Sequence, residues 1–100
     1  MVHVLKLLSK YYDDSKKNIK TFEIRKNDRN FKVGDILKLV SYYPIVIEGE
    51  YKGEVVLADE FHYKQITYIL DNGEYLQPGY VCLGLQPVPE PFANSSEIKR

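Results

Sequence analysis

The side chains best suited to chemistry lie in one basic stretch, residues 20–29. Glu23 stands there between Lys20 and Arg25. A carboxylate beside a lysine can act as a general base or orient a nucleophile, whereas lysine and arginine neutralise phosphates. A structural ion pair explains the same spacing, so binding, catalysis and simple stabilisation all remain open. The candidate nucleic-acid-binding residues are Lys20, Thr21, Glu23, Arg25, Lys26, Asn27, Asp28 and Arg29, and the candidate catalytic residues are Lys20 and Glu23.

Polar and apolar side chains alternate along residues 21–26, which predicts a β-strand. Thr21, Glu23 and Arg25 then share one face, with successive side chains about 6.5 to 7 Å apart. Phe22 and Ile24 share the other face, and we expect that apolar face to point into the core. The polar face would line a functional cleft.

Charge is segregated along the chain. Its 14 basic and 14 acidic residues cancel, yet residues 16–32 carry seven basic and two acidic side chains. Residues 48–60 carry five acidic side chains and one basic one. The basic stretch suits a phosphate-bearing ligand, the acidic stretch suits a protein partner, and clustered surface charge without a function is the alternative.

Other groups give weaker signals. His3 and His62 lie far apart without further ligands at metal-binding spacing, so no metal site and no cofactor are expected. Cys82 lies in an apolar strand and is expected in the core. A single cysteine forms no internal disulfide, which favours a reducing cytoplasm. Tyr68 and Tyr75 are candidates for an exposed stacking platform. No segment resembles a membrane span or signal peptide.

The remaining pattern predicts a single, mostly β (α+β) domain. A helix is expected over residues 10–17, with Ser9 as its N-cap and Asn18 in a left-handed conformation after it. Pro44 should end the third strand, and residues 59–60 should form a turn. The predicted strands span residues 3–7, 21–26, 36–42, 55–58, 63–70 and 80–85. The expected core residues are Phe22, Ile24, Leu37, Leu39, Ile66 and Leu83.

Five or six short strands with one or two short helices favour a small, partly closed β-barrel. We expect the barrel domain to occupy residues 1–86 and a proline-containing C-terminal tail to occupy residues 87–100.

Residues 20–29, followed by Gly34-Asp35, resemble the signature of ASCH domains, a branch of the PUA-like superfamily. Lys20, Glu23 and Arg25 fit its spacing, although Asn18 stands where a glycine is usual. The resemblance covers residues 3–85. It is closest to a small branch, common in phages and mobile elements, that is catalogued as domain of unknown function number 3850. His3 and the pair Tyr51-x-Gly53 match that branch.

The resemblance implies a PUA-like β-barrel with a cleft for RNA or a modified nucleoside. One ASCH group hydrolyses an acetylated cytidine with a lysine, a threonine and a glutamate; Lys20 matches the lysine, but Glu23 stands where the threonine falls. We therefore expect an RNA- or nucleotide-binding module rather than an enzyme. The alternatives are a small amidohydrolase of N4-acylated cytidines and a phage-type protein-interaction domain that uses residues 48–60. The oligomeric state stays open.

Overall fold

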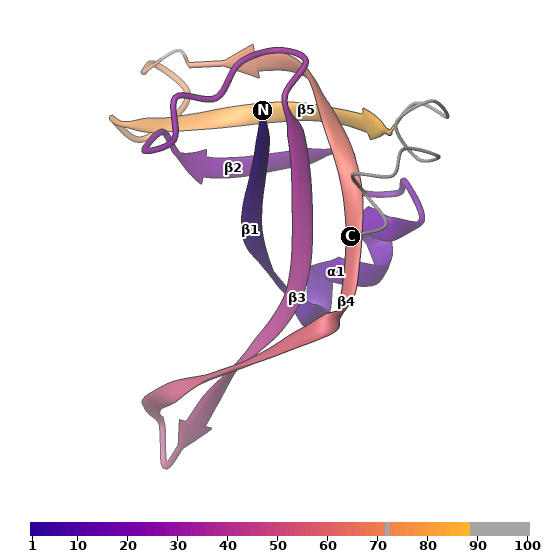
Figure 1. Cartoon of the computed structure of the whole chain (residues 1–100). Helices are drawn as coiled ribbons and strands as arrows, with labels where there is room; N and C mark the ends of the chain where they lie inside the picture. Colours follow the sequence, from indigo (N-terminus) through magenta and orange to yellow (C-terminus); the bar gives the residue numbers. More distant parts are fainter. Residues whose placement is uncertain (72, 89–100) are drawn as a thin grey trace.

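One strongly bent five-stranded sheet forms the body of the protein (Figure 1). The computed structural model describes residues 1–71 and 73–88. Within those residues there is one α-helix, α1 (Ser9–Lys16), which follows the first strand. The strands are β1 (Val2–Leu8), β2 (Phe22–Lys26), β3 (Ile36–Ile47), β4 (Glu50–Leu70) and β5 (Tyr80–Pro87). In the described part of the chain, no helix is long and apolar enough to cross a membrane.

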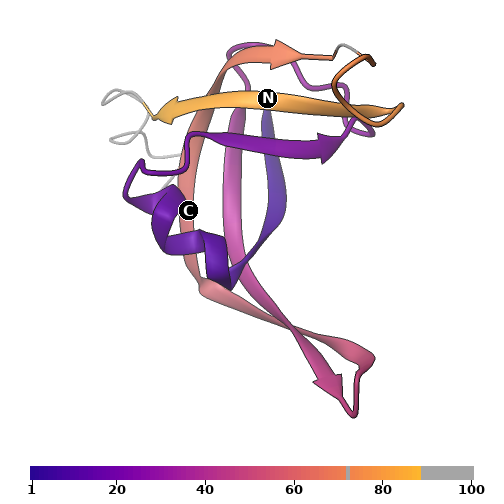
Figure 2. The ribbon, with the colours of Figure 1, turned by 180° about the vertical axis from the view of Figure 1, so that it is seen from behind.

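The sheet is mixed, with the strand order β1-β3-β4-β5-β2. β1 and β3 are parallel, and the other neighbours are antiparallel. β4 is long enough to pair with β3 and then bend to pair with β5, so β5 and β2 run crosswise to the other strands (Figures 1 and 2). The mostly β prediction is confirmed. The sheet is nevertheless not closed into a barrel, because β1 and β2 are its two edges and do not pair with each other.

The core lies between the two halves of this bent sheet. Leu37 and Leu39 from β3 meet Leu83 from β5, and all three are fully buried. Ile66 fills the bend of β4. The prediction is confirmed for these four residues. Helix α1 is only eight residues long, so its stability depends on packing; it buries Tyr12 and Ser15 against the sheet.

The predicted orientation of β2 is wrong. Phe22 and Ile24 are 45% and 53% exposed, whereas Glu23 is buried. Directly opposed residues of an antiparallel pair lie on the same face of the sheet, and Glu23 is opposite the core residue Leu83. The more apolar β5 therefore decides which face of β2 points inward. Cys82 lies opposite Ile24 on the outer face and is partly exposed, so it is not a core residue.

β3 does not end at Pro44. It continues to Ile47, turns at residues 48–49 and returns as β4, so that a two-stranded hairpin projects from the body (Figure 1). We call residues 43–56 the arm. Beyond its last pairing with β1, at Tyr42, β3 pairs with β4 alone among the described residues. An edge strand tolerates a proline because the missing N–H can face solvent.

The two predicted strands 55–58 and 63–70 are parts of the single strand β4. The turn predicted at residues 59–60 is instead a register shift, since Ser41 pairs with Leu57 but Val40 pairs with Phe61. A bulge of this kind bends a strand without ending it.

Helix α1 begins at Ser9 itself. Leu8 occupies the N-cap position without a side-chain hydrogen bond, so the predicted Ser9 cap is wrong. Asn18 has a φ of 63°, which confirms the left-handed residue after the helix. Pro87 is the last residue of β5. The rest of the predicted tail, beyond Val88, lies outside the described residues.

Candidate functional site

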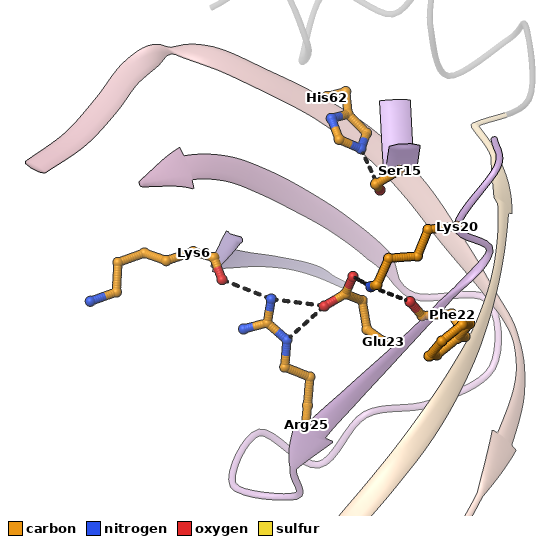
Figure 3. Close-up of polar contacts among 7 residues, drawn as sticks. All are labelled: Lys6, Ser15, Lys20, Phe22, Glu23, Arg25 and His62. Carbon is orange, nitrogen blue, oxygen red and sulfur yellow. Dashed lines mark hydrogen bonds and ion pairs between the residues drawn. The ribbon is translucent and has the colours of Figure 1, made fainter. Parts of the chain in front are cut away.

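The Glu23 carboxylate is buried at the inner face of β2, and its side chain is 5% exposed. Two cations hold it there (Figure 3). Lys20 Nζ donates to Glu23 Oε2, while Arg25 donates to Oε1 from Nε and Nη2 at 3.2 and 3.1 Å. A buried carboxylate is costly unless it is paired and hydrogen-bonded, and this arrangement satisfies both of its oxygens.

Both cations also bind backbone carbonyls. Lys20 Nζ donates to the carbonyl of Phe22 at 2.6 Å, and Arg25 Nη2 donates to the carbonyl of Lys6 at 2.7 Å (Figure 3). The bond to Lys6 links β2 to β1, the opposite edge of the sheet. Each cation thus has two hydrogen-bonding partners within the protein.

This cluster borders a cavity of about 420 Å³ between β1, β2 and the start of α1. Tyr11, Phe22 and Tyr42 contribute aromatic rings to its wall. Lys20 Nζ lies 5.7 Å from the centre of the Tyr11 ring and 5.0 Å from that of Phe22, within cation–π range. The lining residues are Lys6, Leu7, Leu8, Tyr11, Lys20, Phe22, Glu23, Ile24, Arg25 and Tyr42.

A second, smaller cavity of about 140 Å³ adjoins the first through Arg25, which lines both. Lys26, Asp28 and Arg29 lie around it. Arg29 Nη1 donates to the carbonyl of Val4 at 2.8 Å. Arg25 and Arg29 thereby join β2 and the following turn to the free edge of β1, and we call this pair of contacts the arginine bridge.

The structure separates the predicted site residues into groups. Lys20, Glu23 and Arg25 border the larger cavity, whereas Lys26, Asp28 and Arg29 border the smaller one. Two predicted members line neither cavity. Thr21 is exposed and accepts the Leu85 N–H through its carbonyl at 2.9 Å, and the Asn27 N–H donates to the Gly79 carbonyl at 2.7 Å.

Sequence reasoning missed the three polar or aromatic residues of the larger cavity that lie outside residues 20–29: Lys6, Tyr11 and Tyr42. Lys6 is exposed and bonds to Glu54 of the arm, and this hydrogen bond raises the pKa of the Lys6 ammonium. Its Nζ lies 5.3 Å from the centre of the Tyr42 ring. All three residues lie outside the basic stretch, so nothing in the local pattern connects them with Glu23.

The two histidines form separate clusters and do not approach a common ligand position. His3 Nε2 and Asp35 Oδ2 are 2.8 Å apart, and the N-terminal ammonium donates to Asp35 Oδ1 at 3.3 Å. Desolvation works to raise the Asp35 pKa, but the hydrogen bonds from His3 and the Lys32 N–H, with the ammonium, outweigh it and lower that pKa. Among the described residues, no group of three metal-ligating side chains is present.

The second cluster ties α1 to β4. His62 Nε2 lies 2.8 Å from Ser15 Oγ (Figure 3). The His62 ring also packs edge-on against Tyr12. Burial, and then the charges of Lys64 and Lys16, lower the pKa of His62 to about 4. His62 is therefore neutral at ordinary pH. Ser15 is fully buried, which excludes it as a nucleophile for a soluble substrate.

Tyr68 and Tyr75 are 65% and 75% exposed, as expected for a stacking platform, but neither lines the two cavities described here. The chemistry available at the larger cavity is therefore hydrogen bonding by one carboxylate and three cations, Lys6, Lys20 and Arg25, beside aromatic walls. A pocket of this volume admits a small molecule or one nucleoside.

Comparison with known proteins gives one family. A search of curated proteins finds none that matches this chain. The family model described as a domain of unknown function (DUF3850) matches residues 2–85. Because this match spans most of the chain, from β1 to within β5, the protein belongs to the DUF3850 family.

Proposed function

We propose that the larger cavity binds a nucleoside or nucleotide, either free or as an unstacked base of an RNA. The observation that carries this proposal is the buried Glu23 carboxylate, held by Lys20 and Arg25 beside a cavity with aromatic walls. Nucleobases need flat apolar surfaces for stacking and fixed donors and acceptors at their edges. The cavity offers both, and its volume of about 420 Å³ lies within the range of small-ligand sites.

Each group has a role in this proposal. Glu23 accepts a hydrogen bond from a base amine or sugar hydroxyl, and Lys20 donates to a base carbonyl. Tyr11 and Tyr42 stack against the base. Lys26 and Arg29, at the smaller cavity, attract a phosphate attached to that nucleoside. Asp28 borders the same small cavity and opposes multiply charged anions, which favours a single phosphate over a polyphosphate.

The acidic arm favours a small ligand over a long strand. Glu54 contacts Lys6 at the cavity, and Glu48 and Glu50 lie further out, at the tip of the arm. These carboxylates repel an RNA backbone that extends past the cavity. The resemblance to ASCH domains of the PUA-like superfamily supports the same ligand class, and we include that finer assignment in the proposal.

A hydrolase is the second candidate, because Lys20 and Glu23 are in direct contact beside the cavity. For an N4-acylated cytidine, Glu23 would take a proton from water as the water oxygen attacks the acyl carbon. The C–N bond would then break, giving a carboxylic acid and cytidine, with Lys20 protonating the departing nitrogen. Thr21, however, lies outside the cavity lining, and we expect binding without turnover.

The test is titration of the isotope-labelled protein with cytidine, N4-acetylcytidine and cytidine monophosphate, followed by NMR. We expect shifts at Tyr11, Phe22 and Tyr42, and an altered affinity in Glu23→Gln. The matched control is Glu60→Gln, at an exposed position outside the cavity. Absence of cavity shifts with all three ligands would refute the proposal. Acetate release that Glu23→Gln and Lys20→Ala both abolish would establish the hydrolase instead.

A further inference from the structure

The arm exposes large apolar side chains on both of its faces. Val46, Ile47 and Tyr51 are 57%, 55% and 65% exposed. Neighbouring residues of a strand point to opposite faces, so Val46 and Ile47 cannot both be covered from one side. A two-stranded hairpin is marginally stable alone in water, and an apolar patch of this kind marks an interaction surface.

The backbone of the arm also lacks neighbours. β1 pairs with β3 as far as Tyr42, and β5 pairs with β4 only from Lys64 onward. Within the described part of the chain, the two strands of the arm pair with each other and with no third strand. Both outer edges therefore keep backbone N–H and C=O groups free for a partner.

The charges on the arm indicate what kind of surface its partner must have. Glu48 and Glu50 lie at the tip of the arm, and Lys52 is its one basic residue. Lys52 bonds to Glu50 at 2.8 Å, while Glu54 is engaged by Lys6. The arm thus presents apolar side chains beside a net negative charge. A complementary surface must be apolar and basic.

The body of the same chain has such a surface. We call it the basic face: Lys10, Lys20, Arg25 and Lys26. Lys20 and Arg25 line the larger cavity and are ion-paired with Glu23, while Lys26 lines the smaller cavity. Lys10 lines neither, but its Nζ lies 4.9 Å from the centre of the Tyr11 ring, which belongs to the wall of the larger cavity. Among the described residues, neither Lys10 nor Lys26 takes part in an ion pair, so both charges are available to a partner.

We propose that the occupant of the arm is a second copy of this chain, and that two copies dock reciprocally, each arm on the basic face of the other. The arm projects away from its own body (Figures 1 and 2), so its tip, residues 48–50, is accessible to another molecule. In a two-fold symmetric dimer both arms are bound and the assembly is closed, whereas a head-to-tail contact would build open chains. This dimer goes beyond the proposed nucleotide site, although its basic face shares Lys20, Arg25 and Lys26 with that site.

The experiment measures the mass of the full chain by analytical ultracentrifugation across a range of concentrations and salt. Wild type should dimerise, and added salt should weaken the dimer because its contacts are charged. Two double variants reverse the charge on one side each: Glu48→Lys with Glu50→Lys, and Lys10→Glu with Lys26→Glu. Each should be monomeric alone. An equimolar mixture should restore a heterodimer, because each reversed arm then meets the reversed face and each native arm meets the native face.

The matched control is Asp59→Lys with Glu60→Lys, which makes the same charge change in β4 outside the arm. It should dimerise like wild type, and circular dichroism should show every variant folded. A monomeric wild type at all concentrations would overturn the proposal. So would a mixture that stays monomeric, or two charge-reversed variants that both remain dimeric, since arms pairing with each other would give that last result.

Discussion

Replacing Glu23 with glutamine tests whether the buried carboxylate holds this part of the fold together. The substitution keeps the size and one acceptor oxygen but removes the charge that Lys20 and Arg25 share. A hydrogen bond to a charged group contributes about 1.5 to 3 kcal/mol, and breaking a buried pair costs about 3 to 5 kcal/mol.

The expected loss lies below that upper range because the cations keep other partners. The Lys20 and Arg25 side chains are 17% and 22% exposed, so water can partly solvate them. They also retain the carbonyls of Phe22 and Lys6. We therefore expect Glu23→Gln to lower the free energy of unfolding by about 2 kcal/mol. For a domain of this size, such a loss lowers Tm by roughly 8 to 16 °C.

Urea unfolding followed by circular dichroism measures this loss, and the slope of the transition should stay unchanged. The exposed Glu60→Gln is the control and should remain within about 0.5 kcal/mol of wild type. A double-mutant cycle with Lys20→Met should give a coupling of about 1 kcal/mol or more. A Glu23→Gln protein as stable as the control, with no coupling to Lys20, would refute the structural role described here.

Three further predictions use the same unfolding or binding measurements. Leu39→Ala should cost about 2 to 5 kcal/mol because the residue is fully buried, whereas Ile24→Ala, on the exposed face of β2, should cost less than about 1 kcal/mol; equal costs would mean that the faces of β2 are misassigned. The pKa of His62 is lowered to about 4 in the folded state, so the unfolded chain binds a proton at a higher pH than the folded chain does. The free energy of unfolding should therefore fall by at most roughly 3 kcal/mol as the pH drops from about 6.5 to about 4, and His62→Gln should remove this part of the pH dependence. For cytidine monophosphate, Lys26→Ala should weaken binding measured by calorimetry and reduce its salt dependence, while affinity for uncharged cytidine should stay the same; equal losses for both ligands would exclude a phosphate contact.

The sequence pattern predicts most strands and the inner residues of β3, β4 and β5, because long apolar alternation leaves little choice of face. It fails at β2, where alternation is equally clear but the inward face is the charged one. Only the pairing of Glu23 with Leu83 decides that orientation, and such a register connects residues far apart in the chain. Propensity rules also end β3 at Pro44. They do not reveal that one edge of the arm is unpaired among the described residues, so that the missing N–H of the proline can face solvent there.

The candidate site is predictable only where its residues are close together in the sequence. Glu23 and Arg25 share one face of β2, and Lys20 lies only two residues before that strand, so their proximity has a local signal in the sequence. Lys6 and Tyr42 reach the same cavity through the parallel pairing of β1 with β3, which a single sequence does not specify. The separation of Arg29 from Glu23 follows from its bond to the Val4 carbonyl, a contact with no local signal.

The arginine bridge joins the two edges of the sheet by side-chain hydrogen bonds, where a closed barrel would use hydrogen bonds between backbones. Two guanidinium groups occupy the Val4 and Lys6 carbonyls on the outer edge of β1, and those are the acceptors that a foreign strand would need. A ligand phosphate that drew Arg29 away would break its hydrogen bond to the Val4 carbonyl and leave that part of the β1 edge open to strand addition. Occupancy of the small cavity would then change how readily the edge of β1 aggregates.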